Sequence, residues 1–239
     1  MFRFPPLMPF TKALLIALSA TFVTAVLLTR VAGIPVVELL ALLPGVGLHT
    51  AWQIFTYPLV GEPSSGGVIS LLISIVFLWL MMAPFEARYG ARHALQLCVV
   101  STLASAFVFV PAALFLPAHP LVGPSPLFLG VIGAMAAGVP SDARLSFFGV
   151  LPMTPKTMVL VFLGFTVLMN IADGNFAAVP ADAAAIGAGI LFMRWHVLRP
   201  ARARRPKKPA NGRPKRAHGF RVIQGGNDED DDDRPRYLN

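Results

Sequence analysis

The sequence predicts an all-α membrane protein, in which six transmembrane helices form a compact bundle that precedes a charged C-terminal tail. The 239 residues are 55% hydrophobic and only 13% charged, with a mean hydropathy of +0.66, whereas soluble domains carry about 25% charged residues. Of the 20 Lys and Arg residues, 13 lie from Arg194 onward. The net charge of +8 is therefore a property of the tail, and we expect no nucleic-acid partner.

Hydropathy divides the body of the chain into six apolar stretches, at 13–29, 68–84, 94–116, 127–139, 158–171 and 181–195. Several are shorter than the roughly 20 residues that cross a typical bilayer, which fits a bundle in a locally thinned membrane. The first stretch also resembles a secretory signal near Ala20, but its apolar run continues to Leu28, which favours a retained span.

The distribution of basic residues predicts the orientation. Of the 20 Lys and Arg residues, 19 precede the first span or follow the second, fourth and sixth spans, and Arg30 is the exception. Cytoplasmic loops carry the excess of positive charge. We therefore expect a multi-pass protein of a bacterial-type inner membrane, with both termini cytoplasmic.

Three regions follow from this pattern: a cytoplasmic N-terminus over 1–12, a membrane domain over 13–198, and a disordered tail over 199–239 that is basic and then acidic. The basic part of the tail is expected to lie on anionic lipid. Alternatively, the acidic block at 228–233 folds back and competes for those bases.

The connections between spans carry further signals. The first outward loop is apolar or amphipathic over 36–43 and 50–60, and we expect it to lie on the membrane surface. The segment 145–158 is a second candidate of this kind, although Pro152 and Pro155 exclude a continuous helix there. Cys98 lies in an apolar run and is expected to be a small buried side chain.

Small residues predict which helices approach closely. The sixth span offers two pairs with small-xxx-small spacing, Ala183 with Gly187 and Ala185 with Gly189. The fourth span is rich in glycine and alanine over 130–137. Such residues let membrane helices pack backbone to backbone, which would bring Ser125 beside the outer part of the sixth span.

Five landmarks, in order, carry a family resemblance. They are Trp52-Gln53-Ile54-Phe55-Thr56-Tyr57, then Phe77-Leu78-Trp79 with Glu86 and Gly90, then Gly123-Pro124-Ser125, then Gly130, Gly133 and Ala134, and finally the run 180–189. Together they resemble the rhomboid family of intramembrane serine proteases, with Gln53 at a position that is usually Arg. The resemblance implies a nucleophile position at Ser125 and structural roles for Trp52, Glu86, Gly90, Gly123 and Gly187.

Glu86 needs a further explanation, because a carboxylate at the C-terminal end of a helix is poorly placed for the helix dipole. We expect it to have a partner such as Arg88 or Arg92.

The chain departs from the family where the resemblance implies a Ser–His dyad and an oxyanion site. The dyad His corresponds to Ala185, the His and Asn of the second span correspond to Ser70 and Ser74, and the Gly after the serine corresponds to Pro126. A serine hydroxyl is a poor nucleophile without a base, and loss of the base cost about 10⁶-fold in one well-studied serine protease. Loss of one oxyanion donor costs roughly 100- to 1000-fold.

Other groups could in principle supply the missing base. His119 and His49 lie on the same predicted side of the membrane as Ser125, and a partner protein could donate one. A loop histidine lacks the rigid positioning that catalysis requires. A carboxylate such as Asp182 acting on Ser125 without a histidine is a weaker alternative still.

These features favour a rhomboid-like pseudoprotease that binds the transmembrane segments of client proteins without cleaving them, through a lateral gate between the second and fifth spans. The alternative is an active or residually active intramembrane serine protease with Ser125 as nucleophile. An unrelated scaffold or transporter is less supported, because transporters carry ionisable residues within spans or internal repeats. The sequence has no metal-ligand spacing. We expect no metal or other cofactor, and membrane lipid and transmembrane clients as partners.

Overall fold

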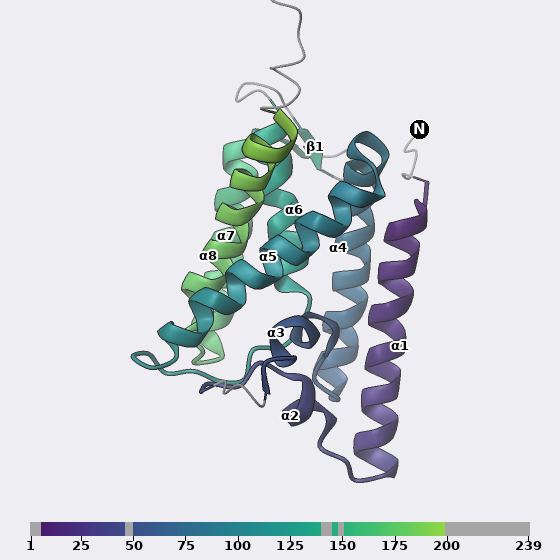
Figure 1. The fold of residues 1–239 in the computed structure, drawn as a ribbon, viewed down its shortest axis with the longest axis vertical. Helices are drawn as coiled ribbons and strands as arrows, with labels where there is room; N and C mark the ends of the chain where they lie inside the picture. Colours follow the sequence, from purple (N-terminus) through teal and green to yellow (C-terminus); the bar gives the residue numbers. More distant parts are fainter. Residues whose placement is uncertain (1–5, 46–49, 140–144, 148–150, 199–239) are drawn as a thin grey trace, which may run out of the picture. The chain divides into compact units, whose positions relative to one another are not determined.

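The computed structural model describes residues 6–45, 50–139, 145–147 and 151–198. Figure 1 shows a bundle of long helices, with the start of α1 and the end of α8 toward the same end of the bundle. The long helices are α1 (Pro9–Val31), α4 (Ser65–Tyr89), α5 (Ala91–Ala112), α6 (Ser125–Gly138), α7 (Pro155–Ala172) and α8 (Ala178–Phe192), which continues as a π-helical turn over Met193–Leu198. The tail expected over 199–239 lies outside the described residues.

Each of the six predicted apolar stretches overlaps one of these helices. Among the described residues, four helices are long and apolar enough to cross a membrane: α1, α4, α5 and α7. The other two are shorter, because α6 has 14 residues and α8 has 15 before its π-helical end. The predicted helical membrane body is thus confirmed, with four helices of full spanning length.

The connection between α1 and α4 is partly helical. It contains α2 (Val36–Leu40), α3 (Gln53–Thr56) and a 3₁₀ turn over Tyr57–Leu59. These elements lie at the end of the bundle where α6 begins, opposite the start of α1 (Figure 1). This end is called the loop end below, and the opposite end is called the basic end because Lys12, Arg88 and Arg92 lie there.

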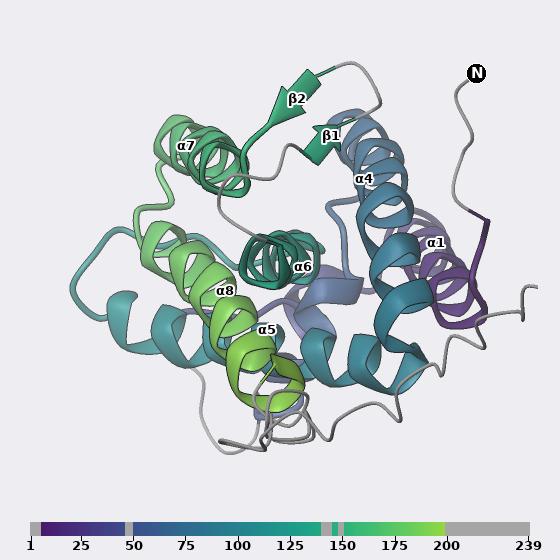
Figure 2. The same cartoon turned by 90° about the horizontal axis from the view of Figure 1, so that it is seen from above.

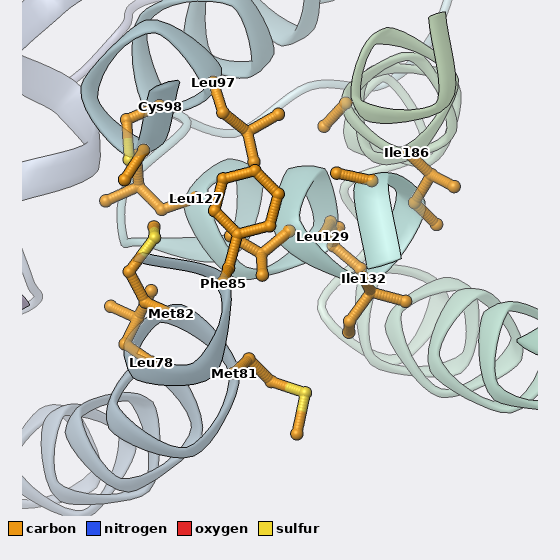
Figure 3. Close-up of a cluster of buried hydrophobic side chains, with 14 of the residues drawn as sticks. Leu78, Met81, Met82, Phe85, Leu97, Cys98, Leu127, Leu129, Ile132 and Ile186 are labelled. Atoms are coloured by element: carbon orange, nitrogen blue, oxygen red, sulfur yellow. The ribbon is translucent and has the colours of Figure 1, made fainter. Parts of the chain in front are cut away.

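The helix α6 is the centre of the bundle. Figure 2 shows it surrounded by α4, α5, α7 and α8, with α1 outside against α4. The largest buried cluster forms where α4 and α5 meet α6, and Figure 3 shows Phe85 of α4 and Leu97 of α5 close to Leu129 of α6. Cys98 is buried in this cluster, as predicted.

Close approach of α6 and α8 depends on glycine. A Cβ atom on Gly189 would clash with the carbonyl oxygen of Gly130, and one on Gly133 would clash with the carbonyl oxygen of Ile186. The backbone-to-backbone packing predicted for the pair of Ala185 and Gly189 is therefore confirmed. The prediction for the pair of Ala183 and Gly187 is wrong, because a Cβ on Gly187 would meet nothing within 4 Å. Spacing alone does not determine which face of α8 turns toward α6.

The partner of Glu86 also differs from the prediction. Its carboxylate is 4% exposed and accepts hydrogen bonds from the backbone N–H groups of Phe10 (2.9 Å) and Thr11 (2.8 Å) and from the Thr11 hydroxyl (2.7 Å). These donors lie in the first turn of α1, where backbone N–H groups lack partners within the helix and the dipole favours a negative charge. Glu86 therefore joins the end of α4 to the start of α1 rather than pairing with Arg88 or Arg92.

The turn between α4 and α5 requires glycine. Gly90 has a φ of 87°, in the left-handed region that side chains disfavour, and its N–H donates to the Glu86 carbonyl at 2.7 Å. The structural role that the resemblance implies for Gly90 is thus the reversal of the chain after Glu86.

Between α6 and α7 the chain forms two short strands, β1 (Leu145–Phe147) and β2 (Leu151–Met153). They pair antiparallel, with Leu145 opposite Met153. The prolines exclude a continuous helix over this segment, as predicted, but the hairpin was not predicted. Helix α7 begins at Pro155, and the side chain of Thr154 caps it by accepting from the Thr157 N–H.

Two glycines of α8 provide a matched test of this packing. Gly189→Ala should lower the thermal unfolding midpoint of the purified protein, because its methyl group would push against backbone and such overpacking costs about 1–3 kcal/mol. Gly187→Ala should leave the midpoint unchanged or raise it, because alanine favours helix over glycine by roughly 1 kcal/mol. Equal destabilisation by the two substitutions would contradict the observed packing.

Candidate functional site

Ser125 lies at the loop end of the bundle, where it is the first residue of α6 and is half-buried. Gly123 precedes it with a φ of 96°, a conformation that favours glycine. Pro126 follows in the first helical turn, where the missing N–H of proline is tolerated. The Gly-x-Ser motif is therefore a tight turn that leads directly into the central helix.

Backbone hydrogen bonds hold this turn against the first loop. Leu42 and Leu121 pair in both directions, with N···O distances of 3.0 and 2.9 Å, and the Gly123 N–H donates to the Tyr57 carbonyl at 3.1 Å. Backbone groups that water does not reach need such partners. The segment before Ser125 is thus fixed by the loop between α1 and α4.

Within that loop, Gln53 acts as a buried clamp. Its side chain is 1% exposed, and its amide N–H donates to the carbonyls of Glu38 (3.2 Å) and Leu39 (3.3 Å). The ring N–H of Trp52 donates to the same Leu39 carbonyl at 3.1 Å. The structural role that the resemblance implies for Trp52 is thus a contact with α2. Gln53 makes neutral hydrogen bonds at a position that is usually Arg in the family.

Tyr57 connects the loop to α5. Its side chain is fully buried, and its hydroxyl donates to the Thr102 carbonyl at 3.0 Å. Burial raises the pKa of Tyr57 above its ordinary value, the Ser105 hydroxyl lowers it, and the Asp182 carboxylate raises it. The phenol therefore stays protonated and remains a hydrogen-bond donor.

A buried carboxylate lies beside Ser125. Asp182 of α8 is 3% exposed, and its Oδ2 atom accepts a hydrogen bond of 2.8 Å from the side-chain amide of Asn170 in α7. The Ser125 hydroxyl is within interaction range of the same carboxylate. However, no described residue makes a hydrogen bond of full geometry to Oδ1 of Asp182. Residues of α6, α7 and α8 therefore meet in one polar cluster: Ser125, Asn170 and Asp182.

The position that corresponds to the dyad histidine carries no base. Ala185 follows Asp182 by one helical turn and has no exposed surface. His119 does not take its place, because its side chain is exposed and its ring Nε2 lies against Gly174. Its backbone is fixed there by two hydrogen bonds of 3.3 Å with the Asn175 side chain. His49, the other histidine considered above, lies outside the described residues.

Few backbone donors remain for an oxyanion near Ser125. The Gly123 N–H is engaged with Tyr57, and the Leu127 N–H donates to the Pro124 carbonyl at 3.0 Å. Pro124 and Pro126 have no N–H. Between Gly123 and Leu127, the N–H of Ser125 itself is therefore the remaining donor.

The two serines at the family's oxyanion positions are not equivalent. Ser74 of α4 is 8% exposed, whereas Ser70, one turn earlier, is exposed. A long side chain at position 70 could extend inward, but the serine hydroxyl is short. Neither side chain therefore replaces the reach of the His and Asn that the family carries.

Sequence reasoning noted Asp182 but missed Asn170, its hydrogen-bond partner. The available signal was the polar character of Asn170 within an otherwise apolar stretch, since a polar residue in a membrane helix usually faces the bundle and finds a partner. The open space beside Gly187 and the loop contacts of Tyr57 had no sequence signal beyond their motifs.

The apolar helices and the polar cluster at the loop end define a multi-pass integral membrane protein. Its family follows from a comparison with protein-family models: the Rhomboid domain model matches residues 48–198, more than half of the chain. The chain therefore belongs to the rhomboid family. A comparison with curated proteins finds no match.

The bond between Asn170 and Asp182 can be tested with a double-mutant cycle. Asn170→Ala and Asp182→Ala should each lower the free energy of unfolding by roughly 1–3 kcal/mol, because each breaks a partly buried hydrogen bond to a carboxylate. The double variant should lose less than the sum of the two single losses. Strictly additive losses, measured by thermal unfolding, would show that the two side chains do not interact.

Proposed function

We propose that this rhomboid-family protein is a pseudoprotease, which holds transmembrane segments of client proteins without cleaving them. With it we propose the expected topology: six spans, both termini cytoplasmic, and a bacterial-type inner membrane. The tail over 199–239 is proposed to lie on the cytoplasmic side. The single observation that carries the proposal is Ala185, a methyl group at the position of the catalytic base.

The surroundings of Ala185 strengthen this argument. The residue has no exposed surface, so the volume that an imidazole ring would need is occupied by neighbouring atoms. Adding bulk to a packed interior costs about 1–3 kcal/mol. An imidazole at this position would therefore require neighbouring side chains to shift.

The oxyanion side of the reaction is weakened in parallel. A tetrahedral intermediate needs several donors aimed at its negative oxygen. Two prolines flank Ser125, and Ser70 is exposed. A chain that lacks both a base and most oxyanion donors is better suited to binding than to hydrolysis.

A client segment would enter between α4 and α7. These helices meet through an edge-to-face contact of Phe77 and Phe162, whose ring centroids are 5.6 Å apart. The ring of Phe77 also lies near that of Phe128 in α6, with their centroids 6.5 Å apart. Rotation of the Phe162 side chain would open a path from the lipid toward α6, and the apolar rings would then pack against the client.

One observation favours the second candidate, a residually active protease. Ser125 lies beside the Asp182 carboxylate, which would accept the hydroxyl proton as the serine attacks a peptide carbonyl. A carboxylate is a weaker base than imidazole, with an ordinary pKa of about 3.9 against about 6.5. This route would therefore be slow, and Asp182→Asn would abolish it.

A fluorophosphonate probe, which forms a covalent bond with activated serines, separates the two candidates. The full-length protein in mild detergent should remain unlabelled, since no base removes the Ser125 proton. Ala185→His should gain labelling that is lost again when Ser125→Ala is added. Because the histidine enters a filled site, thermal unfolding should show that each labelled sample is folded.

The remaining outcomes have definite meanings. Wild-type labelling that disappears in Ser125→Ala and in Asp182→Asn would overturn the pseudoprotease and establish the carboxylate route. Wild-type labelling that survives Asp182→Asn but not Ser125→Ala would also overturn it and would indicate another base.

A further inference from the structure

A groove at the basic end of the bundle is separate from the Ser125 site. It has a volume of about 560 Å³ and lies where the end of α6, the start of α7 and the end of α8 come together. Its walls are mostly small or aliphatic side chains, among them Ala136, Val159 and Ile190. Lys156 and Arg194 line the same groove.

The groove opens toward the surface that faces lipid in a membrane. Leu160 lines it and is 68% exposed, although it lies within α7, one of the helices long and apolar enough to cross a membrane. The half-buried Ala136 leaves space beside it. A hydrocarbon chain could therefore enter from the bilayer and lie along α7.

The two cations give the groove a charge that its walls do not balance. Lys156 and Arg194 are exposed, and neither has an ion-pair partner within the parts of the chain that the structure describes. Lys156 lies in the first turn of α7, where the helix dipole also favours an anion. A negative group placed between them would thus be attracted by both side chains and by the helix end.

The depth of these cations fits the headgroup layer. Lys156 is the second residue of α7, and Arg194 follows the end of α8. Trp195 is 60% exposed next to Arg194, and tryptophan is enriched at the boundary between headgroups and hydrocarbon. The apolar part of the groove extends from this level toward the bilayer centre.

We propose that this groove binds one anionic phospholipid, with its phosphate between Lys156 and Arg194 and an acyl chain along the apolar walls. Basic pockets between transmembrane helices are suited to such headgroups. The acidic block of the tail at 228–233 would satisfy the charges alone, but it would leave the aliphatic walls uncovered. The lipid matches both the charge and the apolar surface, and it would fill the gap between α6, α7 and α8.

The test uses the full-length protein in a neutral detergent, with native mass spectrometry of bound phosphatidylglycerol as the readout. Lys156→Gln combined with Arg194→Gln should weaken binding roughly 30-fold, about fivefold for each lost charge. The matched control is Arg88→Gln combined with Arg92→Gln, two exposed cations at the same end that do not line the groove. This control should bind as the wild type does, because its two cations lie outside the groove. The tail is present in every sample and therefore contributes equally to all of them.

Two further arms examine the apolar walls and the lipid source. Ala136→Leu should reduce phosphatidylglycerol binding without any change of charge, since it fills the groove. Phosphatidylcholine should bind weakly, and inorganic phosphate in excess should not displace the lipid. Equal binding by wild type and the Lys156/Arg194 variant would overturn the proposal, as would an equal loss in the Arg88/Arg92 control. Full displacement by phosphate would reduce the groove to an anion site and would also overturn it.

Discussion

The close approach of α6 and α8 is the constraint on which the rest of the molecule depends. Lipid tails are as apolar as leucine, so membrane helices associate through tight packing and hydrogen bonds rather than through the hydrophobic effect. Gly133 of α6 and Gly189 of α8 let the two backbones touch. This contact fixes the depth of Ser125 relative to α8 and brings it beside Asp182. It also leaves Ala185 without exposed surface.

The loop end shows a second constraint, because irregular backbone at membrane depth must satisfy its own polar groups. The pairing of Leu42 with Leu121, the bond from Gly123 to Tyr57 and the amide of Gln53 do so. These contacts hold the turn before Ser125 in place. The loop end is therefore a rigid outer surface beside a polar cluster, which fits the proposed binding role.

The helices were predictable from the sequence because apolar length and turn residues are local properties. The turn at Gly90 and the close packing at Gly189 followed from short motifs. The partner of Glu86 was not predictable, because the free N–H groups of α1 lie 75 and 76 residues away in the chain. The same reason applies to the bond between Asn170 and Asp182. At the candidate site, Ser125 and Ala185 were predicted from the family resemblance of their motifs, whereas the filled space around Ala185 depends on tertiary packing.

The central claim is that a client segment is bound and not cut, and one reconstitution measures both. A photo-crosslinking amino acid replaces Phe162 in α7 or, as control, Val23, which is 54% exposed on α1. Each protein is placed in vesicles with a single-span test segment labelled at both ends. The account predicts stronger crosslinking of the intact segment from position 162 than from position 23, and no fragments. Fragments that disappear in Ser125→Ala, or equal crosslinking from both positions, would contradict it.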